Sequence, residues 1–243
     1  MLTPYQYPDR SSWSHMTVQD AHTIQYSLAR LEFRSIFAMS MFFALFKTYS
    51  IPSISKLLVA TGRLSNPETT SKRIKNISII ITKVVLNKPG SEKAVKGIAR
   101  MNYLHGRYIK AGKISNDDML YTLSLFALEP IRWTAKFGWR SITDFERCAI
   151  GVYWKDLGEA LGIHYHALSS ATSGWRDGLH WLKELEAWRL AYEARKVVPA
   201  KSNATFARST LDIALSNVPT ILKPYAFKKV CSLLDTRFQT AMK

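Results

Sequence analysis

A helical spacing of apolar residues recurs along the chain, and it is clearest between Glu92 and Tyr108. Five side chains there repeat every three or four residues and share one face of a helix: Ala94, Ile98, Met101, His105 and Tyr108. Basic side chains fall on or near the other side: Lys93, Lys96, Arg100, Arg107 and Lys110. The pattern therefore predicts an amphipathic helix whose inward face includes a histidine, His105.

Capping signals and helix breakers predict where the other helices begin and end. Thr143 and Glu146 form a full capping box, and Ser91 is placed to cap the helix of His105. Pro130 is expected to end the helix before it near Leu128. The remaining predicted helices run from Thr17 towards Tyr49, from Pro67 to Leu86, from Ser115 to about Leu128, from Thr143 to about Leu161, and across Gly174–Lys196, Arg208–Ser216 and Tyr225–Met242.

The long predicted helix Gly174–Lys196 has two distinct faces. Its apolar side chains are expected to point inward: Trp175, Leu179, Leu182, Leu185 and Trp188. Its charged side chains are expected to point outward: Lys183, Glu186 and Arg189.

The fold class follows from what the pattern lacks. No segment shows strict alternation of apolar and polar residues, and there is no internal repeat and no linker long enough to separate domains. Ser78–Val85 is rich enough in Ile and Val to form a strand, but the helix start at Asn66-Pro67-Glu68 favours a helix. The sequence therefore predicts one all-α domain of about eight helices over residues 1–243, with an irregular lead-in over residues 1–16.

The charge of the chain is strongly basic, with 34 Lys and Arg against 18 Asp and Glu and a net charge of +16. Such a field favours nucleic acid, an anionic membrane surface or a small anionic ligand. No basic patch interleaved with aromatic residues and no known binding motif indicates nucleic acid. Two cysteines, Cys148 and Cys231, without metal or haem-attachment spacing are typical of a reduced, intracellular compartment.

Membrane signals are weak. The N-terminus, MLTPYQYPDRSSWSH, has neither the positive region nor the apolar core of a signal peptide. The most apolar run, Ser35–Phe46, has 12 residues, fewer than the roughly 20 that span a bilayer. This run is either a buried core helix or a helix on a membrane surface. We therefore expect an intracellular protein, cytoplasmic or peripherally bound to a membrane.

Common catalytic motifs are absent: the chain has no P-loop, GxGxxG, GxSxG, HExxH or ExxH. His164 and His166 are either part of a metal site or polar loop residues. His105 is either a core histidine bonded to a carbonyl group or a haem ligand, which needs one neutral imidazole in an apolar helical pocket. In the second case four basic residues are candidates to bind the haem propionates: Arg73, Lys75, Arg100 and Arg107.

Four segments of the chain resemble a known family. They are AHTIQYSLARLEF (21–33), KTYSIPSISKLLVATGRLSNPETTSKR (47–73), IARMNYLHGRYIKAGKISNDDMLYTLSLFALEPIRW (98–133) and CAIGVYWKDLGEALGI (148–163). The resemblance is to the fungal branch of the MpaB/rubber-oxygenase family, of which latex clearing proteins are distant members. It covers nearly all of the chain, and its most specific parts are the LHGRY segment and the NDDMLYTLSLF helix that follows.

This resemblance implies an all-α fold that binds haem b non-covalently, activates dioxygen and cleaves carbon–carbon double bonds of isoprenoid-like substrates. The proximal histidine of the family matches His105, and Arg73 matches the arginine of the family's R-x-x-x-T motif. The threonine position holds Ile77, so a hydroxyl that would hold water or oxygen is missing. The resemblance implies that His105 binds the iron. It also implies that Arg73, with Lys75, binds a propionate or lies on the distal side of the haem. The candidate walls of a substrate channel are Ser35–Phe46 and the helix from Trp175.

Three functions stay open from the sequence. The first is a haem oxygenase acting on an isoprenoid or meroterpenoid metabolite. The second keeps the family pocket but runs another reaction, such as cyclisation or isomerisation, and Ile77 is the residue that motivates it. The third is a non-enzymatic basic helical module that binds an anionic membrane or nucleic acid. The chain begins without the N-terminal membrane anchor expected of the endoplasmic-reticulum members, so we expect a soluble or peripheral relative.

Overall fold

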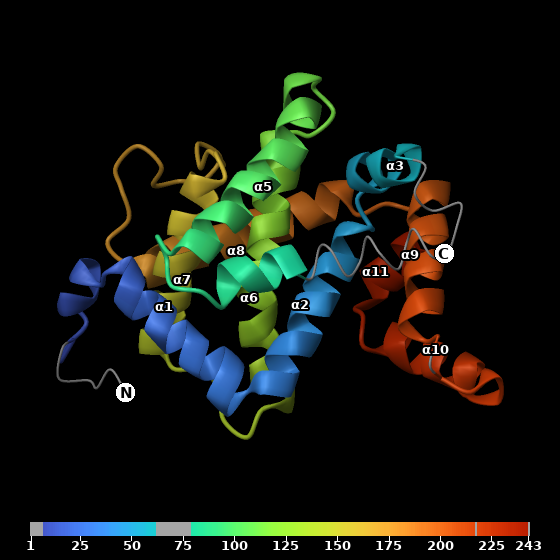
Figure 1. Cartoon of the computed structure of the whole chain (residues 1–243), viewed down its shortest axis with the longest axis horizontal. Coiled ribbons are helices and arrows are strands. Elements are labelled where there is room, and N and C mark those ends of the chain that lie inside the picture. Colours follow the sequence, from blue (N-terminus) through green and yellow to red (C-terminus); the bar gives the residue numbers. More distant parts are fainter. Residues whose placement is uncertain (1–6, 62–78, 217, 243) are drawn as a thin grey trace. The chain divides into compact units, whose positions relative to one another are not determined.

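The computed structural model describes residues 7–61, 79–216 and 218–242, and every regular element in these ranges is helical (Figure 1). The predicted all-α class is therefore confirmed. The chain divides into two compact units, the first made of Met1–Leu45 with Ile80–Ala191 and the second of Phe46–Ile79 with Tyr192–Lys243. Each unit has its own internal packing, and the expectation of a single domain stays a prediction.

The first unit contains the helix of His105. Its helices are α1 (Val18–Ser27), α5 (Glu92–Lys110), α6 (Asn116–Phe137) and α7 (Asp144–Ala160), with most of α2 (Arg34–Thr48) and α8 (Gly178–Lys196). Residues 79–85 are also helical, as their predicted helix start favours. A π-helical turn, Leu28–Glu32, joins α1 to α2. The single helix expected from Thr17 towards Tyr49 is therefore two helices that meet at an angle (Figure 1).

Side-chain caps make the predicted helix starts. The Thr17 hydroxyl accepts a hydrogen bond from the amide three residues on, and Ser91 and Ser115 cap α5 and α6 in the same way. At α7 the Thr143 hydroxyl accepts from the Glu146 amide, while the Glu146 carboxylate accepts from the Thr143 amide. Each cap pairs an amide that the helix itself leaves unbonded and stabilises it by about 1 kcal/mol. These four predicted starts are confirmed.

The expected end of α6 is wrong, because the helix continues through Pro130 to Phe137 instead of ending near Leu128. Proline has no amide hydrogen, so the bond to the carbonyl four residues earlier is lost, at a cost of about 3 kcal/mol. Pro130 is nevertheless buried, and so are Ile131 and Trp133 beyond it. Burial of these apolar side chains offsets the lost bond and keeps the second half of the helix.

Burial along α8 also differs from its predicted pattern. The helix begins at Gly178, not at Gly174. The three leucines expected inside are buried: Leu179, Leu182 and Leu185. Trp181 is buried as well, and Arg189, expected to point outward, is buried too. The buried residues of α8 still share one side of the helix, within an arc of about 160°, but that side includes charged residues such as Arg189 and is not purely apolar.

The second unit contains α3 (Pro52–Ala60), α9 (Lys201–Ala214), α10 (Lys223–Ser232) and α11 (Thr236–Ala241). Its centre is the buried amide of Asn203, whose Nδ2 lies within 3.0 Å of three carbonyl oxygens, those of Ser50, Val198 and Ala241. The Ser55 hydroxyl donates to the Asn203 Oδ1 at 2.6 Å. The expected helix Tyr225–Met242 is two helices, because the backbone is extended at Asp235.

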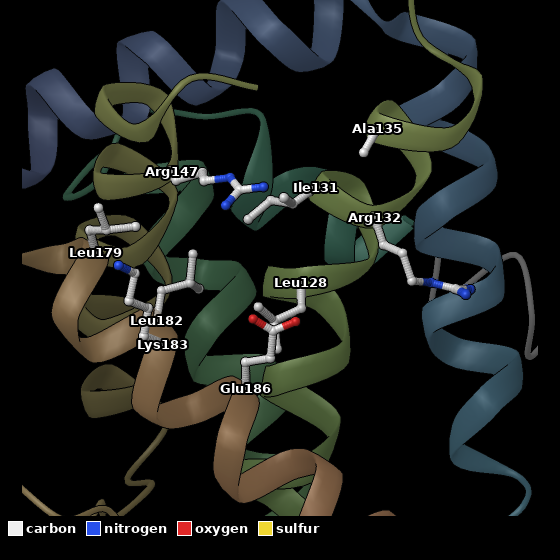
Figure 2. A pocket seen from close by; sticks show the side chains of 9 residues that line it. All are labelled: Leu128, Ile131, Arg132, Ala135, Arg147, Leu179, Leu182, Lys183 and Glu186. Atoms are coloured by element: carbon white, nitrogen blue, oxygen red, sulfur yellow. The ribbon is translucent and has the colours of Figure 1, made fainter. Parts of the chain in front are cut away.

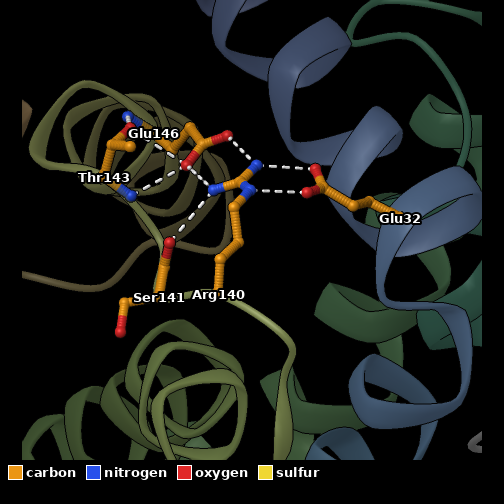
Figure 3. A network of polar contacts seen from close by, with 5 residues as sticks. All are labelled: Glu32, Arg140, Ser141, Thr143 and Glu146. Carbon is orange, nitrogen blue, oxygen red and sulfur yellow. Dashed lines mark hydrogen bonds and ion pairs between the residues drawn. The ribbon is translucent and has the colours of Figure 1, made fainter.

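Arg140, in the loop between α6 and α7, joins two elements through its guanidinium (Figure 3). Its Nε and Nη2 donate to the Glu32 carboxylate at 2.6 and 2.7 Å, and its Nη1 and Nη2 donate to Glu146 at 2.8 and 2.7 Å. Burial alone would raise the pKa of Glu146, but the hydrogen bonds from Arg140 and Thr143 lower it below its ordinary value. The network ties the end of the π-helical turn to the first turn of α7.

Close packing around α7 requires glycine at two of its positions. A Cβ on Gly151 would overlap the carbonyl oxygen of Gly178, the first residue of α8. A Cβ on Gly158 would overlap the hydroxyl of Tyr165, which donates a hydrogen bond to the Lys155 carbonyl at 2.7 Å. α1 and α6 also pack against α7. The first unit is therefore assembled around this helix.

Gly151→Ala is expected to destabilise the chain by about 3 kcal/mol, because the added methyl group has no space beside Gly178. Gly106→Ala is the matched control: it also lies inside a helix, but a Cβ there meets nothing within 4 Å. That change should stabilise the chain by about 0.5–1 kcal/mol. Urea unfolding followed by circular dichroism measures both, and equal effects would contradict the close packing.

Arg140→Met is expected to lower the free energy of unfolding at neutral pH by about 2 kcal/mol, because two partly buried carboxylates lose charged hydrogen bonds. Lys96→Met, which breaks only the exposed pair with Glu92, should cost about 0.5 kcal/mol or less. Since the pKa of Glu146 is held below its ordinary 4.5 in the folded chain, its contribution is present above that pH and lost as the pH falls below it. The gap between wild type and Arg140→Met should therefore shrink in acid; a constant gap would contradict the ion pair.

Candidate functional site

His105 lies near the end of α5 with its imidazole half-buried. Its Nδ1 is buried and has no hydrogen-bond partner among the residues that the structure describes. Burial lowers the pKa of His105 below its ordinary value of 6.5, because the charged form is poorly solvated there. At neutral pH the side chain is therefore a neutral imidazole, which is the form that binds metal ions.

The position of α5 is set through the helical residues 80–85. A Cβ on Gly97 would lie 2.7 Å from Val84 Cγ2, so α5 approaches these residues closely at this glycine. Tyr153 of α7 in turn donates a hydrogen bond to the Val84 carbonyl at 3.1 Å. His105 lies about two turns beyond Gly97 on α5. Contacts that begin at α7 thus hold the helix that carries His105.

The basic residues expected near the haem are not gathered around His105 in the described part of the chain. Arg73, Lys75 and Ile77 lie outside the described residues. Arg100 and Arg107 are exposed, with their guanidinium groups 5.5 Å from the Tyr103 ring and 4.6 Å from the Tyr108 ring, respectively. At 100° per residue they are about 140° and 160° around the helix from His105. Their binding of propionates stays a prediction.

Two polar side chains of α1 are buried among apolar ones. His22 is 4% exposed and Gln25 is 1% exposed. Neither the His22 Nε2 nor the amide atoms of Gln25 have a hydrogen-bond partner among the described residues. Burial lowers the pKa of His22, a hydrogen bond with the Val85 main chain partly offsets this, and the charge of Lys88 lowers it further. A buried polar group without a partner lowers the free energy of unfolding by roughly 1–3 kcal/mol. His22 and Gln25 therefore mark a polar position inside the first unit.

No role is predicted from the sequence for His22 or Gln25. The signal that marks them is their spacing of three residues within the apolar face of α1, between Ala21, Ile24 and Leu28. Polar residues at inward positions of a helix are informative, because burial without a partner is costly.

The first unit contains a cavity of about 150 Å³ between α6, α7 and α8 (Figure 2). Apolar and charged side chains share its wall: Leu128, Ile131, Arg132, Ala135, Arg147, Leu179, Leu182, Lys183 and Glu186. A wider cleft of about 540 Å³ is bordered by Trp13, Lys155 and Trp175, among others. His105 borders neither space.

The two expected walls of a substrate channel have different surroundings. In Ser35–Phe46, which forms most of α2, the side chains of Phe37, Phe43 and Ala44 are buried. The Phe43 ring lies 4.6 Å from that of Trp133 on α6, so one side of this run packs in the core, while Met39 is exposed. It borders neither cavity, whereas Trp175 borders the wider cleft. In the described ranges, no helix has both the length and the apolar character needed to cross a bilayer.

The described residues offer single nitrogen donors rather than a cluster of metal-binding side chains. Within residues 7–61, 79–216 and 218–242, no three His, Cys, Asp or Glu side chains are grouped to hold a metal ion. His164 and His166 are exposed in a loop, where the His164 amide donates to Asn116 Oδ1 at 2.8 Å. A haem iron needs only one protein ligand. The neutral, half-buried His105 with its unpartnered nitrogen fits that requirement.

Comparison with known proteins identifies close relatives, although no protein-family model matches the chain. The chain is 42% identical over 238 residues to the ER-bound oxygenase mpaB of Penicillium roqueforti (strain FM164), covering 98% of the chain and 80% of that protein. It is 42% identical over 242 residues to the ER-bound oxygenase mpaB' of Penicillium brevicompactum, covering 100% of the chain and 57% of the relative. It is 43% identical over 217 residues to the ER-bound oxygenase mpaB of the same species, covering 89% and 55%. The chain thus spans little more than half of the two Penicillium brevicompactum proteins.

Acidification is expected to destabilise the chain through His22. Because the folded chain holds the pKa of His22 below 6.5, the unfolded chain takes up its proton first as the pH falls. The free energy of unfolding should therefore fall as the pH decreases below about 7, by up to about 1.4 kcal/mol per pH unit. His22→Leu should flatten this slope in urea-unfolding measurements, and the exposed His166→Leu should not. A slope unchanged by His22→Leu would contradict the assignment.

Proposed function

Because the chain belongs to the MpaB family of oxygenases, we propose that it is a haem b-dependent oxygenase of secondary metabolism that attacks a carbon–carbon double bond of an isoprenoid-like molecule. The relatives' names support an oxygenase. The haem, the bond and the substrate rest on the family resemblance. The observation that carries the proposal is the neutral, half-buried imidazole of His105, at the position that matches the family's proximal ligand.

His105 would hold the haem iron, and the rest of the first unit would keep this imidazole available. Burial disfavours its protonation, so the nitrogen lone pair is not lost to a proton at neutral pH. The contact of Gly97 with Val84 holds α5 and limits movement of His105 away from its position. When bound, the haem supplies the redox chemistry of dioxygen, and the chain supplies the ligand, the orientation and the exclusion of water.

Basic side chains would neutralise the haem propionates. Arg73 and Lys75 are the proposed residues for this role or for the distal side, and Arg73 is the one that matches a family motif. Arg107 donates a hydrogen bond to the Tyr108 hydroxyl at 2.6 Å, and Arg100 lies over the Tyr103 ring. Both would have to leave these contacts to reach a propionate. Arg73 and Lys75 are therefore the first residues to test.

The proposed place of action is the surface of the endoplasmic reticulum, because the three relatives are named ER-bound. An isoprenoid-like substrate would partition into such a membrane, since apolar chains leave water. The proposed partners are therefore a hydrophobic small molecule and, peripherally, the membrane that holds it.

Haem binding is the first test of this function. Titration of the purified chain with hemin, followed by absorbance, should give a Soret band of a histidine-ligated haem. His105→Ala should weaken binding by more than the roughly 100-fold that loss of an outer-shell partner of a metal site costs. His166→Ala is the matched control, because His166 is exposed in a loop, and it should bind like wild type. Absence of a Soret band in the wild-type chain, or equal binding by both variants, would contradict the proposal.

Oxygen consumption separates the oxygenase from a family pocket that runs another reaction. If the chain binds haem but consumes no oxygen with an isoprenoid substrate, Ile77→Thr restores the hydroxyl of the family motif. Oxygen uptake by this variant would show that Ile77 is the reason why the wild-type chain consumes no oxygen. No uptake in either protein, with haem bound, would favour a cyclase or isomerase.

A further inference from the structure

The outward side of α5 carries an exposed apolar stripe. Val95 is 52% exposed, Tyr103 is 73% exposed and Ile109 is 44% exposed. At 100° per residue these three side chains fall within an arc of about 120° of the helix. Ala99, in the same arc, is also exposed. These side chains are spaced along the helix, and an exposed apolar row of this kind beside cations is what a helix at a lipid interface presents.

A cationic stripe lies beside the apolar one. Five exposed basic side chains fall within an arc of about 100° of α5: Lys93, Lys96, Arg100, Arg107 and Lys110. Glu92 is the acidic residue of α5, and it pairs with Lys96. The helix surface therefore keeps a strong positive excess next to apolar groups.

We propose that this outward surface of α5, formed by the two stripes, docks the protein on an anionic membrane surface. An amphipathic helix lies in the lipid interface when its apolar side chains enter the headgroup region and its cations meet anionic headgroups. Tyr103 suits this boundary, since its ring is apolar and its hydroxyl is polar. Charge complementarity selects anionic lipid over a neutral one.

Two alternatives account for less of this surface. Nucleic acid would use the cations, but exposed Val95 and Ile109 gain nothing from phosphates. Another exposed apolar group precedes and begins α10, at Ile221, Leu222 and Tyr225. It has Lys223, Lys228 and Lys229 nearby, so it carries fewer cations than α5. The α10 group is therefore the rival surface that the experiment must exclude.

Docking through α5 would turn the cationic stripe toward the membrane and away from His105, with Ile109 of the apolar stripe about 40° from His105 around the helix. The cations are turned away from His105 around the helix axis, as the positions of Arg100 and Arg107 show. Membrane contact therefore leaves the inward face of α5 in the first unit. This inference deepens the proposed location at a membrane and does not depend on the haem.

The test is sedimentation of the full chain with vesicles of phosphatidylcholine containing about 30% phosphatidylserine. The wild type should bind these vesicles and not pure phosphatidylcholine. The variant Lys93→Gln, Lys96→Gln, Lys110→Gln should lower the partition coefficient about 100-fold, without changing hemin binding. Arg100 and Arg107 stay unchanged, because they are candidates for the haem site. Circular dichroism checks that the helices persist, since Gln is a good helix former.

The matched control removes the same charge from the rival surface, with Lys223→Gln, Lys228→Gln, Lys229→Gln. It should change the partition coefficient less than about threefold, because surface attraction falls off within a Debye length of the membrane. An equal or larger loss in this control would overturn the proposal in favour of α10 or of non-specific attraction. Wild-type binding to DNA but not to the vesicles would overturn it as well.

Substitution of the apolar stripe tests insertion separately from attraction. Val95→Ser, Tyr103→Ser, Ile109→Ser should lower vesicle binding at least about tenfold, including at high salt where charge attraction is screened. No effect would overturn docking through α5. If the chain co-fractionates with endoplasmic reticulum but does not bind anionic vesicles, the proposed location stands and this inference fails. If the chain binds vesicles through α5 but does not co-fractionate with endoplasmic reticulum, this inference stands and the proposed location fails.

Discussion

The close approach of α7 to its neighbours is the constraint on which the first unit depends. Gly151 leaves room for the start of α8, and α1 lies along the same helix. Tyr153 then bonds the Val84 carbonyl, and Val84 packs against Gly97 of α5. The position of His105 therefore depends on α7, through the hydrogen bond of Tyr153 to Val84 and the close contacts that Gly151 and Gly97 allow. No bulky side chain at these glycines is compatible with the same arrangement.

The sequence predicted those features that depend on interactions between residues close together in the chain. The caps at Thr17, Ser91 and Thr143 were readable because a hydroxyl three residues before an orphan amide is a short-range interaction. Pro130 was misleading because packing of the residues beyond it is a long-range effect. The buried Arg189 and Gln25 escape prediction for the same reason: a polar residue is assigned to the surface until its neighbours are known. Of the candidate site, the inward position of His105 was readable from periodicity, whereas its role comes from resemblance to a family.

The two sides of α5 give one helix two kinds of chemistry. Inside, burial keeps His105 neutral, and a neutral imidazole is what an iron ligand requires. Outside, five cations and three exposed apolar side chains form the proposed membrane surface. In this proposal, the basic side chains of α5 bind the anionic membrane that would hold the proposed apolar substrate. Because one rigid helix carries both faces, docking would orient the proposed haem site relative to the bilayer.

The most direct measurement is imidazole rescue of His105→Gly. In this variant the haem should lose its histidine-ligated absorbance and magnetic circular dichroism spectrum, and millimolar imidazole should restore it by filling the space that the side chain leaves. Iron ligation by His105 predicts this loss and recovery, with no effect of imidazole on wild type. Identical spectra of wild type and His105→Gly before imidazole is added would contradict the assignment of His105 as the iron ligand, and with it the proposed haem site.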